Sequence, residues 1–145
     1  MGLLSFLFGS TAEVVLDDNT ATKHYYDSAS SQLRRNEIEN LENLYDDLGN
    51  KGTVRVPALL SVGYGVNDSI DYIVTERVNN GWSLSQLREN GYKSEAKQAV
   101  KLAKQAIRGT GIHLPDLETD GNILVTIGDN GDIINVWLVD VGDIY

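Results

Sequence analysis

Cysteine is absent from this 145-residue chain, and histidine occurs only twice, at His24 and His113. These absences exclude a disulfide framework and a zinc site with cysteine ligands, and two distant histidines do not predict a histidine-rich metal site. Long apolar runs are lacking too, because the apolar N-terminus ends at Phe8 and no other stretch approaches the length of a membrane span. The N-terminus has neither the basic region nor the cleavage site of a signal peptide, so we interpret residues 1–8 as a buried strand of a cytoplasmic protein.

Basic residues are also scarce. The chain has 12 lysine and arginine residues against 21 aspartate and glutamate residues, which gives a net charge of -9. A nucleic-acid-binding protein needs a basic surface that displaces counterions from phosphates, and an anionic membrane attracts the same kind of surface. We therefore expect no nucleic-acid partner and no membrane partner. The apolar fraction of 41% is ordinary for a globular protein, and the length fits a single domain over residues 1–145.

In the first half of the chain, apolar and β-branched segments alternate with turn residues, which predicts strands. The predicted strands lie at residues 13–16, 20–26, 53–62 and 71–78. A loop that contains Gly63 and Gly65 divides the last two. Residues 29–48 have the period of a helix with one apolar face. The leucines on that face are Leu33, Leu41, Leu44 and Leu48.

The second half predicts two helices and a hairpin. Ser83 and Gln86 form a capping box for a short helix, and residues 93–108 predict a longer one that ends at a C-cap glycine, Gly109. Strands are then predicted at residues 122–127 and 133–139, with Asp-Asn-Gly between them as a hairpin turn. The order of strands, helix, strands, helices and hairpin is typical of an α+β fold and not of a doubly wound sheet.

Two charged residues interrupt apolar faces. Glu37 lies four residues from Leu33 and four from Leu41, in the middle of the helix stripe. In the preceding strand, Lys23 shares one face with Ala21 and Tyr25. A buried charge is unfavourable unless a partner of opposite sign meets it. Each residue alone is more often a tolerated surface charge, but together they predict a Lys23–Glu37 ion pair between the strand and the helix.

Polar residues that suit metal and hydroxyl chemistry cluster near the C-terminus. Asp116 and Asn122 precede one apolar strand, and Asp140 follows the next and is itself followed by a glycine. Carboxylate and amide oxygens suit magnesium, and a carboxylate can accept a hydroxyl proton. Asp140 alone could equally be an ordinary turn aspartate. With Lys23 and Glu37, however, the order Lys, Glu, Asp, Asn, Asp is that of the protein-kinase signature set.

The segments around these residues resemble the minimal bacterial effector kinases of the OspG/NleH type, over nearly the whole chain. Six segments of these kinases have a counterpart here. Residues 8–14 resemble the phosphate-covering loop, residues 21–23 the strand with the ATP-pairing lysine, and residues 36–41 the helix with its glutamate. Residues 72–78 resemble the strand into the adenine hinge, residues 113–122 the catalytic loop, and residues 139–145 the magnesium-binding segment. The resemblance implies an α+β, protein-kinase-like fold. It consists of an N-lobe antiparallel sheet with one αC-like helix, at about residues 1–78, and a much reduced C-lobe of helices and a catalytic-loop hairpin, at residues 79–145.

The resemblance also implies roles for individual residues. Gly9 and Ser10 would cover the phosphates of ATP, Lys23 would hold the α- and β-phosphates, and Glu37 would orient Lys23. Asp116 would be the base for the substrate hydroxyl, and Asn122 and Asp140 would be Mg²⁺ ligands. Glu76 and Val78 would contact the adenine. The acidic balance does not oppose ATP, which needs only a few local cations and the metal ion. The partner would be a protein substrate or an activating protein, and an effector of this type would be delivered into a host cell.

Three interpretations follow. The first is an active minimal Ser/Thr protein kinase, favoured by the presence of all five polar residues. The second is a pseudokinase that binds nucleotide or only a partner protein. It is favoured because only Gly9 remains of the glycine-rich loop, because six steps instead of five separate Asp116 from Asn122, and because the sequence ends five residues after Asp140. The third is an α+β domain whose acidic residues are solvated surface. We expect the kinase-like fold over the third interpretation, and activity slightly over inactivity.

Overall fold

The computed structural model describes residues 4–8, 12–49, 51–112 and 122–139. The strands are β1 (Leu4–Phe8), β2 (Ala12–Leu16), β3 (Thr20–Tyr25), β4 (Val54–Arg55), β5 (Leu59–Tyr64), β6 (Ile70–Glu76), β7 (Ile123–Ile127) and β8 (Ile133–Leu138). The helices are α1 (Ser31–Asp47), α2 (Leu84–Glu89) and α3 (Lys93–Arg108), with a 3₁₀ turn, η1, at Val66–Asp68. The elements form an α+β fold, as predicted. None of the helices within these ranges is long and apolar enough to cross a membrane.

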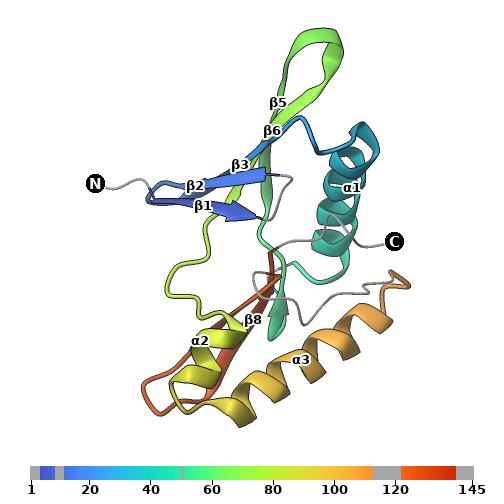
Figure 1. Cartoon of the computed structure of the whole chain (residues 1–145). Coiled ribbons are helices and arrows are strands. Elements are labelled where there is room, and N and C mark those ends of the chain that lie inside the picture. Colours follow the sequence, from blue (N-terminus) through green and yellow to red (C-terminus); the bar gives the residue numbers. More distant parts are fainter. Residues whose placement is uncertain (1–3, 9–11, 50, 113–121, 140–145) are drawn as a thin grey trace.

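The upper part of the molecule is a five-stranded antiparallel sheet in the order β1-β2-β3-β6-β5 (Figure 1). β1 confirms the strand predicted near the N-terminus. β3 lies in the middle of the sheet, and Lys23 is paired there with Val14 on one side and Ile73 on the other. The lysine is thus held on a strand that hydrogen-bonds to both neighbours.

Helix α1 packs beside this sheet (Figure 1). It begins because the side chain of Ser30 accepts a hydrogen bond from the backbone N–H of Leu33, which satisfies one of the free donors of the first turn. Leu41 and Leu44 are buried, as the helical period predicts, and Glu37 is buried with them. The helix therefore places a carboxylate, and not only leucine side chains, against the rest of the protein.

The lower part is a three-stranded sheet in the order β4-β8-β7, with α2 and α3 beside it (Figure 1). The predicted hairpin of β7 and β8 is confirmed, and Gly131 in its turn has a φ of +86°, a value that glycine adopts readily. The predicted capping box of α2 is also confirmed, since Ser83 and Gln86 each accept a backbone N–H of the other. Ile123, Val125 and the buried face of α3 then form the core of this part.

Two details of the prediction were wrong. The strand predicted at residues 53–62 is two strands in different sheets, because β4 pairs in parallel with β8 whereas β5 pairs with β6. Pro57 lies between them and has no N–H to continue a ladder. Gly63 lies inside β5 instead of in a loop, and the hairpin turns at η1. The predicted C-cap of α3 at Gly109 is confirmed; Gly109 has an ordinary helical φ of -67°, and the left-handed conformation falls on Gly111, at +75°.

Candidate functional site

The site begins with an ion pair between β3 and α1. The Nζ atom of Lys23 lies 2.8 Å from Oε2 and 3.0 Å from Oε1 of Glu37, so the ammonium group contacts both carboxylate oxygens. The Glu37 side chain is 1% exposed and that of Lys23 is 12% exposed. The predicted pair is therefore confirmed, and its lysine is the member that solvent or a ligand can still reach.

Two residues that the sequence did not single out complete this cluster. The hydroxyl group of Tyr25 donates a hydrogen bond of 2.5 Å to Oε1 of Glu37, and the Tyr25 ring lies 5.9 Å from Nζ of Lys23. The guanidinium group of Arg34 lies 5.3 Å from the same ring. The Tyr25 ring is thus close to two cations, and its hydroxyl group holds the carboxylate that one of them binds.

Arg34 fixes the geometry of this region through three backbone carbonyls. Its Nε atom donates to Ala29, its Nη1 to Ile70 and its Nη2 to Tyr26, at 3.1, 2.6 and 2.8 Å. These carbonyls belong to the entry of α1, the start of β6 and the end of the β3 segment. Arg34 therefore ties the helix that carries Glu37 to the sheet that carries Lys23. In the sequence, the role of Arg34 is indicated only by its position, one helical turn before Glu37.

The electrostatics of the cluster follow from burial. A carboxylate that is removed from water needs a cation and hydrogen-bond donors, and Glu37 has the ammonium group of Lys23 and the hydroxyl group of Tyr25. With these partners the carboxylate fixes the lysine side chain in one position. Such a preorganised cation can bind an anionic group, for example a phosphate, without first losing side-chain freedom.

The segment after β6 leads from the upper sheet to the lower one. The carboxylate of Glu76 accepts a hydrogen bond of 2.7 Å from the N–H of Ala58, and its own N–H donates to the carbonyl of Ala58 at 3.0 Å. The side chain and the backbone N–H of Glu76 are thus both occupied with Ala58, the residue before β5, and the N–H of Arg77 donates to the carbonyl of Asn19 at 3.1 Å. The contact with adenine that the resemblance implies for Glu76 stays a prediction.

Val78 and the residues that follow it pack against β7. A Cβ atom on Gly81 would lie 3.0 Å from Cβ of Leu124 and 3.3 Å from Cγ1 of Val78, so only glycine fits there without displacement. The next residue, Trp82, exchanges two backbone hydrogen bonds of 2.8 Å with Val125. Val78 and Leu124, both half-buried, are therefore brought together by a tight backbone approach. Leu124 and Gly81 were missed by sequence reasoning, since neither departs from an ordinary strand or turn pattern.

Asn122 lies at the open end of the β7–β8 hairpin, the end that is directed toward the upper sheet (Figure 1). Its carbonyl accepts a hydrogen bond of 3.0 Å from the N–H of Val139, the residue that directly precedes Asp140. The backbone thus brings the two predicted metal-binding segments side by side. The other predicted site residues, Gly9, Ser10, Asp116 and Asp140, lie outside the described residues.

The chemistry of the described residues suits a nucleotide and a metal ion. Lys23 is a fixed cation that is still partly exposed, and Val78 and Leu124 are half-buried apolar residues on either side of Gly81. Asn122 provides an amide oxygen, a ligand that suits magnesium. Within the described ranges no group of three or more His, Asp or Glu side chains could hold a metal ion by itself. The predicted magnesium site depends on Asp140 and on the phosphates of the nucleotide.

Comparison with solved structures decides the fold. A crystal structure of WbdD, a bifunctional kinase-methyltransferase, matches 100% of this chain with a TM-score of 0.66 at 16% identity. The kinase domain of Mycobacterium tuberculosis PknI matches 96% of the chain with a TM-score of 0.62 at 16% identity. The chain has a protein-kinase-like fold.

The kinase-like chain also matches APH(2")-IIia, in its complex with GDP and kanamycin, over 99% of its length with a TM-score of 0.61 at 11% identity. It spans about a third of WbdD (33%), 58% of the PknI chain and 67% of the APH(2")-IIia chain. No protein-family model matches the sequence, and no curated protein matches it. At these identities the similarity establishes the fold, and the effector-kinase subtype that the sequence resembles stays a prediction.

Proposed function

We propose that this kinase-like domain binds ATP with Mg²⁺ and transfers a phosphoryl group to a serine or threonine of a protein. The observation that carries the proposal is the buried, doubly hydrogen-bonded Lys23–Glu37 pair in the middle of the five-stranded sheet. In a kinase-like fold a pair of this kind orients the lysine toward the phosphates of the nucleotide. The remaining roles are assigned by resemblance to the same fold.

The chain's own residues would act as follows. Lys23 would bind phosphate oxygens, while Glu37 and Tyr25 keep its ammonium group in place. The backbone of residues 76–78 and the apolar side chains of Val78 and Leu124 would enclose the base. Asn122 and Asp140 would hold Mg²⁺, which neutralises charge on the phosphates when bound. Asp116 would accept the proton of the attacking hydroxyl group.

The protein acceptor is the least supported part of the proposal. Of the three matched folds, WbdD is a kinase-methyltransferase and APH(2")-IIia was crystallised with kanamycin, so the fold alone does not define the acceptor. A pseudokinase that binds nucleotide or a partner without transfer is the alternative. It is favoured by the extra residue between Asp116 and Asn122, since displacing a base from its hydroxyl strongly reduces the rate.

Incubation with radiolabelled ATP, Mg²⁺ and casein as a generic acceptor tests the proposal. The wild type should label casein or itself, and Asp116→Ala should reduce the rate about a hundredfold or more, the usual contribution of a general base. Asp129→Ala, which changes an exposed carboxylate in the β7–β8 turn, is the matched control and should leave the rate unchanged. Equal labelling by wild type and Asp116→Ala would refute the assigned base. Tight ATP binding without labelling would establish the pseudokinase alternative.

A further inference from the structure

Helix α3 carries a row of cations that the proposed phosphoryl transfer does not use. Lysine or arginine occurs at positions 93, 97, 101, 104 and 108, at intervals of four, four, three and four residues. At 100° per residue these five positions fall within an arc of about 80°. They extend over 15 residue steps, or roughly 22 Å at 1.5 Å per residue. We call Lys93, Lys97, Lys101, Lys104 and Arg108 the cationic stripe.

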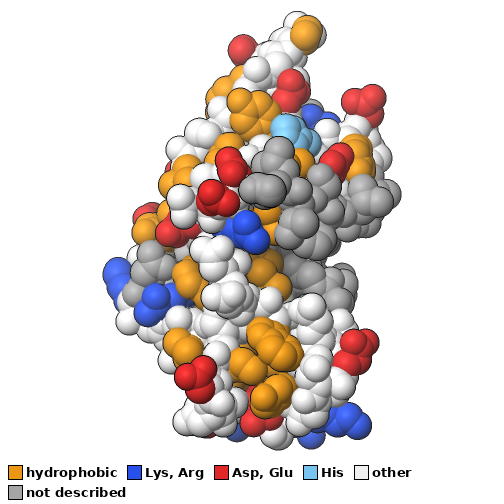
Figure 2. Space-filling view, turned by 90° about the vertical axis from the view of Figure 1, so that its left-hand side faces the viewer, with side chains coloured by type: hydrophobic (Ala, Val, Ile, Leu, Met, Phe, Trp, Pro, Cys, Tyr) orange, Lys and Arg blue, Asp and Glu red, His pale blue; other side chains and the backbone are white. Residues whose placement is uncertain are grey.

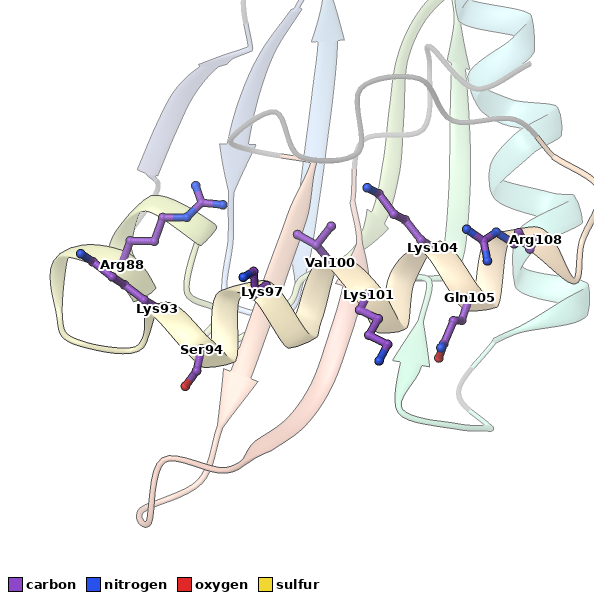
Figure 3. A pocket seen from close by; sticks show the side chains of 9 residues that line it. All are labelled: Arg88, Lys93, Ser94, Lys97, Val100, Lys101, Lys104, Gln105 and Arg108. Atoms are coloured by element: carbon purple, nitrogen blue, oxygen red, sulfur yellow. The ribbon is translucent and has the colours of Figure 1, made fainter.

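The stripe lines an open recess of about 750 Å³ on the surface of α3. Arg88 of α2 adds a sixth cation at the end where Lys93 lies, and Val100 is the one apolar side chain of the lining (Figure 3). All six cations are exposed, whereas Val100 is only 6% exposed. The recess is therefore a charged surface with Val100 at its floor, formed along α3 and the end of α2.

This concentration of positive charge contrasts with the rest of the protein. Residues 88–108 hold six of the 12 basic residues and only two of the 21 acidic ones, Glu89 and Glu95. The remaining 124 residues hold six basic and 19 acidic residues. On the face shown in Figure 2, most visible acidic side chains lie in the upper part, whereas lysine and arginine side chains lie mostly lower down, beside a few acidic ones. The molecule has a strongly uneven distribution of charge.

Repulsion among the cations of the stripe disfavours α3. Like charges three or four residues apart repel each other by about 0.2–0.5 kcal/mol per pair. Lys93 also lies in the first turn, where the helix dipole disfavours cations, and only Arg108 lies in the favourable last turn. Within the described ranges, Lys97 and Lys101 form no ion pair that would offset this repulsion. An anionic ligand bound along the stripe would offset this repulsion.

We propose that the cationic stripe is a docking surface for an acidic segment of another protein. Only an extended ligand can contact five cations spread over about 22 Å, which a single phosphate group cannot do. A membrane or a nucleic acid would bring a large anionic surface against the whole molecule, whose remainder is strongly acidic. A peptide segment needs to approach only the stripe, so it avoids this repulsion. The proposal stands whether or not the domain transfers phosphate.

A second copy of this chain is a less suitable occupant. Its α1 carries an acidic row at Glu39, Glu42 and Asp46, but no large hydrophobic residue of α1 is exposed among the described residues. Two folded helices would meet through exposed ion pairs alone, and such pairs contribute little. A flexible acidic segment can instead follow the recess and reach Val100.

Fluorescence anisotropy with labelled glutamate peptides tests the proposal at about 0.15 M salt, where the Debye length is about 8 Å. A decaglutamate peptide spans roughly 33 Å when extended and covers the stripe, whereas a tetraglutamate spans roughly 13 Å and reaches only part of it. We expect the longer peptide to bind more tightly. The double variant Lys97→Glu/Lys101→Glu should weaken its binding about tenfold or more, because two attractive pairs become repulsive.

Arg35→Glu/Lys51→Glu is the matched control. It changes the net charge by the same amount at two exposed cations outside the stripe, and it should bind decaglutamate like the wild type. Circular dichroism checks that each variant is folded. Parallel measurements use phosphatidylcholine vesicles with phosphatidylserine, duplex DNA and the protein's own self-association.

Each outcome of these measurements either supports or overturns the proposed docking surface. A stripe-dependent loss of decaglutamate binding, with the control unaffected, supports the proposal. No binding of decaglutamate, or equal weakening by the stripe variant and the control, overturns it. Tighter binding of vesicles or duplex DNA than of decaglutamate also overturns it, and so does self-association that Lys97→Glu/Lys101→Glu abolishes, since these results identify a different occupant.

Discussion

The ammonium group of Lys23 lies within 3.0 Å of both carboxylate oxygens of Glu37, and this one pair joins the middle of the five-stranded sheet to α1. The two residues are 14 positions apart and come from elements of different type. Their pairing has a structural consequence, because Glu37 is buried, and a functional one, because Lys23 remains partly exposed.

Removing one member of the pair should destabilise the protein strongly. Lys23→Ala leaves a buried carboxylate without its cation, which typically reduces the free energy of unfolding by about 3–5 kcal/mol. The double variant Lys23→Met/Glu37→Leu removes both charges and should lose less than Lys23→Ala alone. Urea unfolding of the two variants checks this, with Lys51→Ala as the exposed control. A larger loss in the double variant would contradict this, because it would show that the unpaired carboxylate is not the source of the destabilisation.

Tyr25→Phe should reduce the free energy of unfolding by about 1.5–3 kcal/mol, since it removes a hydrogen bond to a charged, buried group and keeps the ring. Tyr64→Phe makes the same chemical change at a side chain that is 64% exposed and should have no measurable effect. Both variants are compared by thermal and urea unfolding. Equal stability of Tyr25→Phe and wild type would mean that Lys23 alone satisfies Glu37.

Gly81→Ala should disturb the contact between the segment after β6 and β7. The added methyl group would lie 3.0 Å from Leu124, and overpacking of this kind costs about 1–3 kcal/mol. Because Val78 touches the same point, the affinity for ATP should fall as well. Gly52→Ala is the control, since no atom lies within 4 Å of its added Cβ, and it should be neutral or slightly stabilising. ATP titration and urea unfolding of the two variants would separate the effects.

The sequence predicted those parts of the site that break a pattern. Lys23 and Glu37 are charges on apolar faces, so their pairing could be inferred from local periodicity. Tyr25 could not, because a tyrosine on the apolar face of a strand is indistinguishable from a core residue until its hydroxyl group is placed. Arg34 acts through backbone carbonyls of three segments, which no pattern of residue types shows.

The fold was predictable to a similar degree. Each helix and hairpin followed from short-range period, capping and turn residues. The separation of β4 from β5 was not predictable, since β4 pairs with β8, which lies about 80 residues further along the chain. The cationic stripe was also overlooked. The helix at α3 is predicted from its apolar positions, and the charged positions on its other face were not needed for that prediction.

The most direct test of the proposed function is a calorimetric titration of ATP into the protein, with Mg²⁺ and after its removal by EDTA. We predict binding with Mg²⁺ and little or none without it, because Asp140 would then repel the phosphates. With Mg²⁺ present, Lys23→Met should weaken ATP binding about tenfold or more, the loss expected for a hydrogen bond to a charged group. Lys51→Met should bind ATP like the wild type. Equal affinity with and without Mg²⁺ would contradict the metal site, and no binding under either condition would contradict the proposed nucleotide site as a whole.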